Sequence, residues 1–135
     1  MGYNLSDAAR NAAVNAIVDL VDVGSTNAQG ALQFRDASQV IASLNLNNPA
    51  FGASAGGSAA LDVTGTINGT VTPAGQSTID RFRIVSRDVT TIFDGAAGSV
   101  AVSGADINLS SVVVNQNDVI EITGLSVSVP ASGGA

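Results

Sequence analysis

The first 24 residues show the spacing of polar and apolar positions that is typical of a helix. Their polar side chains recur at steps of three or four and form one narrow stripe on a helix of roughly 3.6 residues per turn; the stripe consists of Asp7, Asn11, Asn15, Asp19 and Asp22. Ser6 precedes the run as a candidate N-cap, and Gly24 stands where a C-terminal cap belongs. The pattern predicts a helix between these two residues.

The apolar arc of this helix is broader than contact with one sheet requires. In one interpretation the helix is buried on two sides, by its own domain and by a neighbouring subunit; in the other its small alanines face water. The candidate interface residues in the first case are Asp7, Arg10, Val14, Ile17, Val18 and Val21. Asp19 and Asp22 lie near the negative end of the helix dipole, either as a docking point for an Arg of another chain or as solvated side chains.

After Gly24 the pattern changes to short runs in which apolar and polar residues alternate. Such alternation indicates strands with one buried face and one face in water. Asn68-Gly69 is the strongest hairpin signal in the chain and predicts a turn between two strands. The runs lie at 32–35, 40–47, 61–67, 70–72, 78–87, 92–94, 100–102, 107–109, 112–114 and 118–129.

The last run, 118–129, changes phase at Gly124. Its apolar residues divide between two parities, with Ile120 and Ile122 on one and Leu125, Val127 and Val129 on the other. Slippage by one residue, as in a β-bulge, would return all of them to the core. We therefore predict a single bulged strand with its irregularity at Gly124.

Short strands separated by turns at intervals of about 8–12 residues are typical of a sandwich or barrel. We predict a mainly β protein, a two-sheet antiparallel β-sandwich (jelly-roll or immunoglobulin-like) of about eight short strands with an N-terminal α-helix. Residues 1–24 are expected to form the helix or arm, and residues 25–135 the β-sandwich domain.

Composition and charge exclude several classes of function. The chain of 135 residues has no His, Cys or Lys, and its formal net charge is −6. Without His or Cys, the common catalytic triads and dyads and zinc sites are excluded. Nucleic-acid binding needs a surplus of cations, and a membrane span needs about 18 apolar residues in succession. We expect no nucleic-acid partner, no membrane and no cofactor.

Carboxylates are the remaining candidates for chemistry. Glycoside hydrolysis uses two of them together with aromatic platforms for the sugar, but the four Phe and one Tyr fall mostly at predicted core positions. A calcium site needs clustered oxygen ligands, and the nearest approaches, at 106–108 and 115–118, are explained more simply as turns. We therefore predict no enzymatic activity, no catalytic residues and no metal site.

Three of the five cations fall close together in the run 78–87 and form an arginine stripe, which consists of Arg81, Arg83 and Arg87. Arg binds carboxylates in a forked, two-bond geometry that Lys does not reproduce. One hypothesis is a contact with acidic residues of a neighbouring subunit, such as Asp62 or Asp94. The alternative is cross-strand pairing within one chain, to Asp80, Asp88 or Asp62.

The chain resembles small virion structural proteins of tailed bacteriophages. The resemblance extends over nearly the whole chain, in the segments 5–13 with 18–24, 48–52, 81–88, 92–95, 104–109 and 125–130. It includes the Pro-Ala-Phe-Gly turn at 49–52 and the Arg-Phe-Arg-Ile-Val-Ser-Arg-Asp strand at 81–88. The resemblance implies a structural role in the virion.

The low charge of the chain and its additional apolar helix favour a position on the outer surface of the phage head. We expect a capsid decoration (cement) protein that binds the lattice of the major capsid protein and forms a homo-oligomer such as a trimer. Its location would be the capsid surface of the virion, after assembly in the host cytoplasm. The alternative is a tail or fibre component that contacts other tail proteins or host saccharide.

Overall fold

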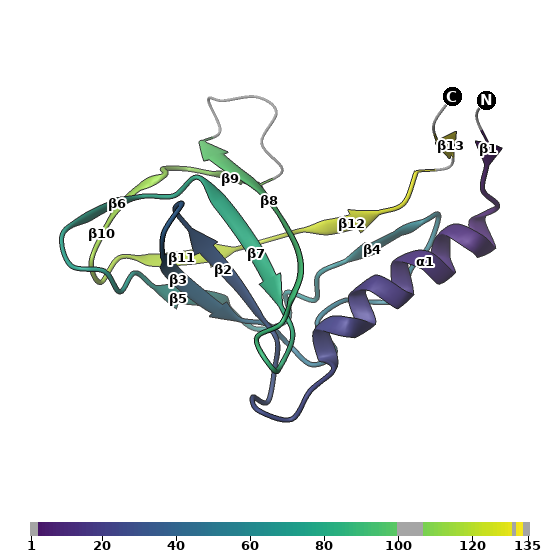
Figure 1. Ribbon diagram of the computed structural model, residues 1–135, viewed down its shortest axis with the longest axis horizontal. Helices are drawn as coiled ribbons and strands as arrows, with labels where there is room; N and C mark the ends of the chain where they lie inside the picture. The colour runs from purple at the N-terminus through teal and green to yellow at the C-terminus, as the bar shows by residue number, and fades with distance from the viewer. Residues whose placement is uncertain (1–2, 100–106, 131, 134–135) are drawn as a thin grey trace.

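The computed structural model describes residues 3–99, 107–130 and 132–133. The protein is mainly β, with one α-helix near its N-terminus. A five-stranded sheet in the order β3-β2-β7-β8-β9 forms the body of the molecule (Figure 1). Its strands are β2 (Ala31–Arg35), β3 (Val40–Asn45), β7 (Arg81–Val85), β8 (Thr91–Ser99) and β9 (Ile107–Leu109).

Alternation along these strands separates a buried face from an outer face. Phe34 of β2 and Phe82 of β7 are opposite each other and buried, whereas Arg35 and Arg81, one position along, lie on the outer face. The pairs β3–β2, β2–β7 and β7–β8 are antiparallel, as expected. One pair departs from this expectation, because β9 returns to lie parallel to the last residues of β8.

The other described strands form two-stranded antiparallel pairs: β1 (Tyr3–Asn4) with β13 (Ser132–Gly133), β4 (Ser58–Ala60) with β12 (Ser126–Ser128), β5 (Ile67–Thr70) with β11 (Val119–Ile122), and β6 (Gln76–Thr78) with β10 (Val113–Asn115). The described residues thus contain thirteen short strands rather than about eight. The number is higher because the run 118–129 contains two strands and because β1, β4 and β13 lie outside the predicted runs.

The hairpin predicted at Asn68-Gly69 is wrong. Both residues lie inside β5, where they pair with Glu121 and Ile120 of β11. A Cβ atom on Gly69 would collide with the carbonyl oxygen of Ser43 in β3. Glycine is needed here because two strands approach each other closely, not because the chain turns.

The single bulged strand predicted for 118–129 is also wrong. The run contains two strands, β11 and β12, separated by residues 123–125. Because β11 pairs with β5 and β12 with β4, each segment has its own register and its own inward parity. Ile120 and Ile122 are buried, and Val127 packs against the same core from β12. The apolar residues do change parity near Gly124, but the cause is a break between two strands and not a bulge within one.

The helix α1 (Asp7–Asp19) continues into a short 3₁₀-helix, η1 (Leu20–Asp22). The predicted N-cap is confirmed, since the Ser6 Oγ atom accepts a hydrogen bond of 3.1 Å from the Ala9 amide. Gly24 follows with a φ of +133°, a conformation that side-chain-bearing residues rarely adopt. Within the described residues, no helix has the length and apolar character to cross a membrane.

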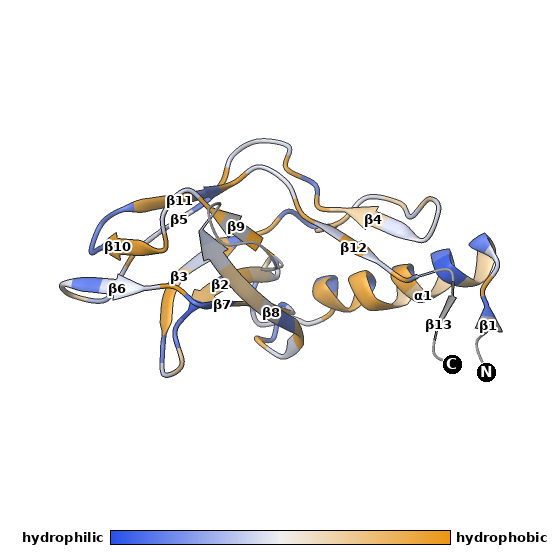
Figure 2. Cartoon of the chain, turned by 90° about the horizontal axis from the view of Figure 1, so that it is seen from above, coloured by the Kyte–Doolittle hydropathy of each residue, from blue (hydrophilic) through white to orange (hydrophobic). Residues whose placement is uncertain are grey.

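The helix packs along β4 and β12, so that these three elements form an arm beside the five-stranded sheet (Figure 1). Figure 2 shows that its apolar residues gather in the half nearest the sheet. Polar side chains fasten the other half: the Arg10 Nε atom donates to the Val129 carbonyl at 2.9 Å, and the Asn11 Oδ1 atom accepts from the Gly57 amide at 2.8 Å. The arm therefore contains β4 and β12 as well as α1. The predicted run at 100–102 lies outside the described residues.

Candidate functional site

The outer face of the five-stranded sheet brings three arginines together. The strand registers align two rows of side chains across it: Ser43, Gln33, Arg83 and Asp94 in one, and Val40, Arg35, Arg81 and Ala96 in the other. We call this surface the arginine face and define it by Gln33, Arg35, Arg81, Arg83 and Asp94. It is a cationic surface on a chain whose net charge is −6.

Within the part of the chain that the structure describes, the arginines of this face have weak partners. The Arg83 Nη2 atom lies 4.0 Å from the Asp94 Oδ2 atom, and the Arg81 Nε atom lies 3.3 Å from the Asp80 Oδ1 atom. The Arg35 Nη1 atom donates to the Gln33 side chain at 3.0 Å. Exposed ion pairs of this kind contribute about 0–1 kcal/mol. Much of the hydrogen-bonding capacity of the guanidinium groups therefore remains for a partner.

Two further features of the arginine face are unfavourable for an isolated chain. Arg35 and Arg81 are direct cross-strand partners, and like charges in that arrangement repel each other. The Arg83 Nε atom is buried and has no hydrogen-bond partner among the residues that the structure describes. An added carboxylate would reduce the repulsion and bind the guanidinium groups in a forked geometry.

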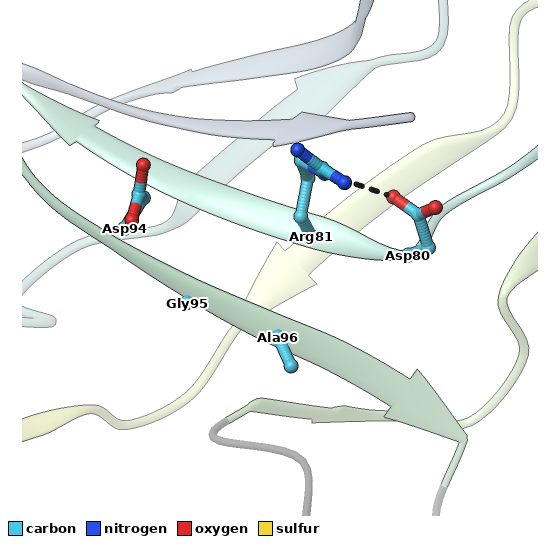
Figure 3. A pocket seen from close by; sticks show the side chains of 5 residues that line it. All are labelled: Asp80, Arg81, Asp94, Gly95 and Ala96. Atoms are coloured by element: carbon cyan, nitrogen blue, oxygen red, sulfur yellow. Dashed lines mark hydrogen bonds and ion pairs between the residues drawn. The ribbon is translucent and has the colours of Figure 1, made fainter. Parts of the chain in front are cut away.

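A hollow of about 310 Å³ lies on the same surface and is lined by Asp80, Arg81, Asp94, Gly95 and Ala96. Figure 3 shows Arg81 turned toward Asp80, the residue that precedes its strand, with Asp94 on the neighbouring strand. Gly95 and Ala96 have little or no side chain, so they leave the space open. The hollow therefore has a floor of small residues, with the guanidinium group of Arg81 and the carboxylates of Asp80 and Asp94 at its sides.

The structure separates the three arginines of the predicted stripe. Arg81 and Arg83 lie on the arginine face as expected, but Arg87 lies beyond the end of β7, where its Nε atom donates to the Asn27 carbonyl at 2.7 Å. Arg35 takes the third place on the face. Sequence reasoning missed Arg35 because only the pairing of β2 with β7 brings it opposite Arg81.

The predicted helix residues lie on the arm rather than on the arginine face. Val14, Val18 and Val21 are buried by the chain itself, with exposed fractions of 0%, 3% and 0%. Ile17 is half-buried. Arg10 pairs with Asp7 at 3.2 Å in addition to its bond to the Val129 carbonyl. Burial within one chain accounts for the three valines.

The described residues contain no group of three or more His, Cys, Asp or Glu side chains that could hold a metal ion. At 115–118, the Asp118 Oδ2 atom accepts a hydrogen bond of 2.8 Å from the Asn115 amide, so this segment is a turn, as the simpler interpretation had it. The chemistry that the arginine face offers is the binding of carboxylates.

Comparison of the chain with protein-family models, with curated proteins and with solved structures finds no match.

Proposed function

We propose that this protein is a structural component of a tailed-bacteriophage virion, a decoration protein that binds the lattice of the major capsid protein. The arginine face is the observation that carries the proposal, because guanidinium groups gathered on one surface bind the carboxylates of a partner protein in a forked geometry. Its three guanidinium groups are held at fixed spacings by neighbouring strands. A partner with exposed carboxylates at matching positions would bind there.

The modest size of this surface suits a repeated binding site. A lattice presents the same acidic site many times, and an oligomer that engages several sites gains strength by multivalency without a large contact at any one of them. Homo-oligomers of closed symmetry fit such positions. The rest of the exterior is acidic, which disfavours binding to DNA.

The finer architecture belongs to the same proposal. We infer a two-sheet sandwich of jelly-roll or immunoglobulin type, in which the five-stranded sheet is one layer and the pairs β5–β11 and β6–β10 contribute to the other. Its support is a single cluster of buried residues that includes side chains from both sets of strands, such as Phe34, Ile84, Ile120 and Val114.

The location of the protein in intact virions tests the proposed function. Virions of the phage that encodes the chain are labelled with gold-conjugated antibody raised against the purified protein and imaged by electron microscopy. We expect label distributed over the head surface. Label on the tail or fibres would overturn the assignment to the head and support the tail alternative. Virions without label and without the protein by mass spectrometry would overturn the structural role itself.

A further inference from the structure

A groove follows the edge of the strands that come after β8. It consists of two hollows, of about 600 and 230 Å³, which adjoin each other because both are lined by Leu109, Glu121 and Thr123. We call them together the edge groove and define it by its lining residues, which fall within 107–114 and 118–126. The edge groove shares no residue with the arginine face.

The edge groove lies on the unpaired side of β10 and β11. Within the described residues, β10 pairs only with β6 and β11 only with β5, and no residue of β5 or β6 lines the groove. The lining includes the buried Val114 and Ile120 as well as the exposed Val113 and Val119. A groove over one face of a strand would be lined by alternate residues. This groove therefore runs along the strand edge, where a strand offers its backbone amides and carbonyls to a further strand.

Exposed valines and carboxylates occur together in the edge groove. Val113 and Val119 are 45% and 64% exposed, and Asp118 and Glu121 are exposed beside them. Figure 2 shows β10 and β11 as mainly apolar strands. The described residues that line the groove include no Arg, and neither carboxylate forms an ion pair with another described residue. The groove is therefore apolar and acidic at once.

The two carboxylates retain most of their capacity to bind a cation. Glu121 lies opposite the uncharged Asn68 in the β5–β11 pair. The Asp118 Oδ2 atom accepts one hydrogen bond, of 2.8 Å, from the Asn115 amide, and an ionised carboxylate has about four acceptor sites. Val119 and Glu121 are two positions apart in β11, so their side chains lie on the same face. A Lys or Arg side chain could cover Val119 with its methylene groups and bind Glu121 with its charged end.

We propose that the edge groove binds an extended segment of the major capsid protein, which adds a strand beside β11 and carries Lys or Arg next to aliphatic side chains. Backbone hydrogen bonds to the strand edge would provide affinity, and alternate side chains in the groove would provide specificity. Such a segment complements both the valines and the carboxylates, whereas an acidic segment would be repelled. The inference rests on the proposed function and adds a second contact, separate from the arginine face.

Fluorescence anisotropy with a labelled peptide tests the chemistry of the groove. The probe is a short peptide of alternating Val and Arg, and a second probe has Glu in place of Arg. We expect saturable binding of the Val-Arg peptide and no binding of the Val-Glu peptide. Glu121→Gln and Val119→Thr should each weaken binding at least fivefold. Asp19→Asn and Val63→Thr, which remove an exposed carboxylate and an exposed valine elsewhere, are the matched controls and should leave binding unchanged.

Two results of this experiment would overturn the inference. One is the absence of saturable binding to the unmodified chain. The other is an equal effect of Glu121→Gln and Asp19→Asn, which would show that the peptide is attracted by the net charge of the chain and not by the groove. Circular dichroism of each variant shows that it is folded.

Backbone methylation of the peptide separates strand addition from ion pairing. Methyl groups on the amide nitrogens of alternate residues block one edge of an extended peptide and leave its side chains unchanged. Two such peptides, methylated on opposite edges, are compared. We expect one of them to bind at least tenfold more weakly than the unmethylated peptide and the other to bind normally. Equal binding of the two methylated peptides would overturn the added strand.

Loading onto virions connects the groove to the proposed function. We expect Glu121→Arg to reduce loading at least fivefold relative to the unmodified chain. Undiminished loading of a folded Glu121→Arg variant, with antibody label still on the heads, would overturn the inference and leave the decoration role intact. Absence of the protein from virions would overturn the proposed function and with it the capsid partner. Dimers of the unmodified chain that Glu121→Gln disrupts in sedimentation velocity would identify a second copy as the occupant and overturn the capsid assignment.

Discussion

The backbone of Val89 has a conformation that is unfavourable for a β-branched residue, with a φ angle of +63°. A left-handed conformation costs a residue with a Cβ atom roughly 1–2 kcal/mol, and β-branching adds to the crowding. Most of its side chain is in water, so burial within the chain returns little of that free energy. The strain is therefore a local cost for which the isolated chain offers no compensation.

We predict that Val89→Gly raises the free energy of unfolding by about 1 kcal/mol, because relief of the left-handed strain exceeds the added backbone entropy of glycine in the unfolded state. Urea unfolding followed by circular dichroism measures the change. Val119→Gly serves as the control, since it places glycine inside a strand and should lower stability. A Val89→Gly variant that is less stable than the original chain would show that the turn is not strained.

Three aspartates bind backbone amides in loops, and this makes stability depend on pH. Hydrogen bonds from Ser38, Thr64 and Ser25 are the main causes that lower the pKa values of Asp36, Asp62 and Asp88, respectively, below the ordinary value of 3.8. A carboxyl group with a depressed pKa in the folded state stabilises the fold above its unfolded pKa and loses that contribution as the pH falls.

We therefore predict that the urea midpoint falls as the pH is lowered from about 5 to about 2, through the window below the ordinary aspartate pKa. Asp88→Asn should lower the midpoint at neutral pH and make its decrease in acid smaller. Burial raises the pKa of Asp22, so this group acts in the opposite direction and gains stability in acid. A midpoint that rises throughout this range would contradict the stabilising role of the three turns.

At the scale of elements, the position of β5 depends on one glycine. We predict that Gly69→Ala lowers the free energy of unfolding by about 1–3 kcal/mol, because the added methyl group would meet the backbone of β3 rather than a flexible side chain. Gly124→Ala is the matched control, since a Cβ atom there has no neighbour within 4 Å. Equal stability of the two variants in urea would show that β3 and β5 are not tightly apposed.

The apolar side of α1 leads to a second prediction at the scale of elements. Val18→Asp should reduce stability by about 3–5 kcal/mol or prevent folding, because it places an unpaired charge in the core of the same chain. Ala16→Asp, on the exposed side of the helix, should remain folded. Thermal unfolding monitored by circular dichroism distinguishes them. A folded Val18→Asp variant that only fails to associate would place the arc at a subunit contact instead.

At the scale of the whole molecule, charge is distributed unevenly. The arginine face is cationic while the chain as a whole carries −6. We predict that Arg81→Glu combined with Arg83→Glu abolishes self-association and loading onto virions while the chain stays folded, and that added salt weakens the original contact by screening. Sedimentation at low and high salt and a particle pull-down measure the two effects. Full loading of the double variant would show that the arginine face is not a binding surface.

The spacing of polar and apolar residues predicts those features that depend only on residues close together in the sequence. The cap at Ser6, the alternation of β2 and β7 and the mainly β character all depend on spacings of a few residues, so they can be predicted from the chain alone. The change of phase near Gly124 was visible for the same reason, although its cause was not.

The pairing of strands was decided only in three dimensions. Arg35 meets Arg81, and Gly69 meets Ser43, across long stretches of intervening chain. Such contacts depend on which strands pair and which sheets pack together. The alternation of polar and apolar residues in one strand does not identify its partner strand. The arginine face is a surface of this kind, because it gathers residues from distant parts of the sequence.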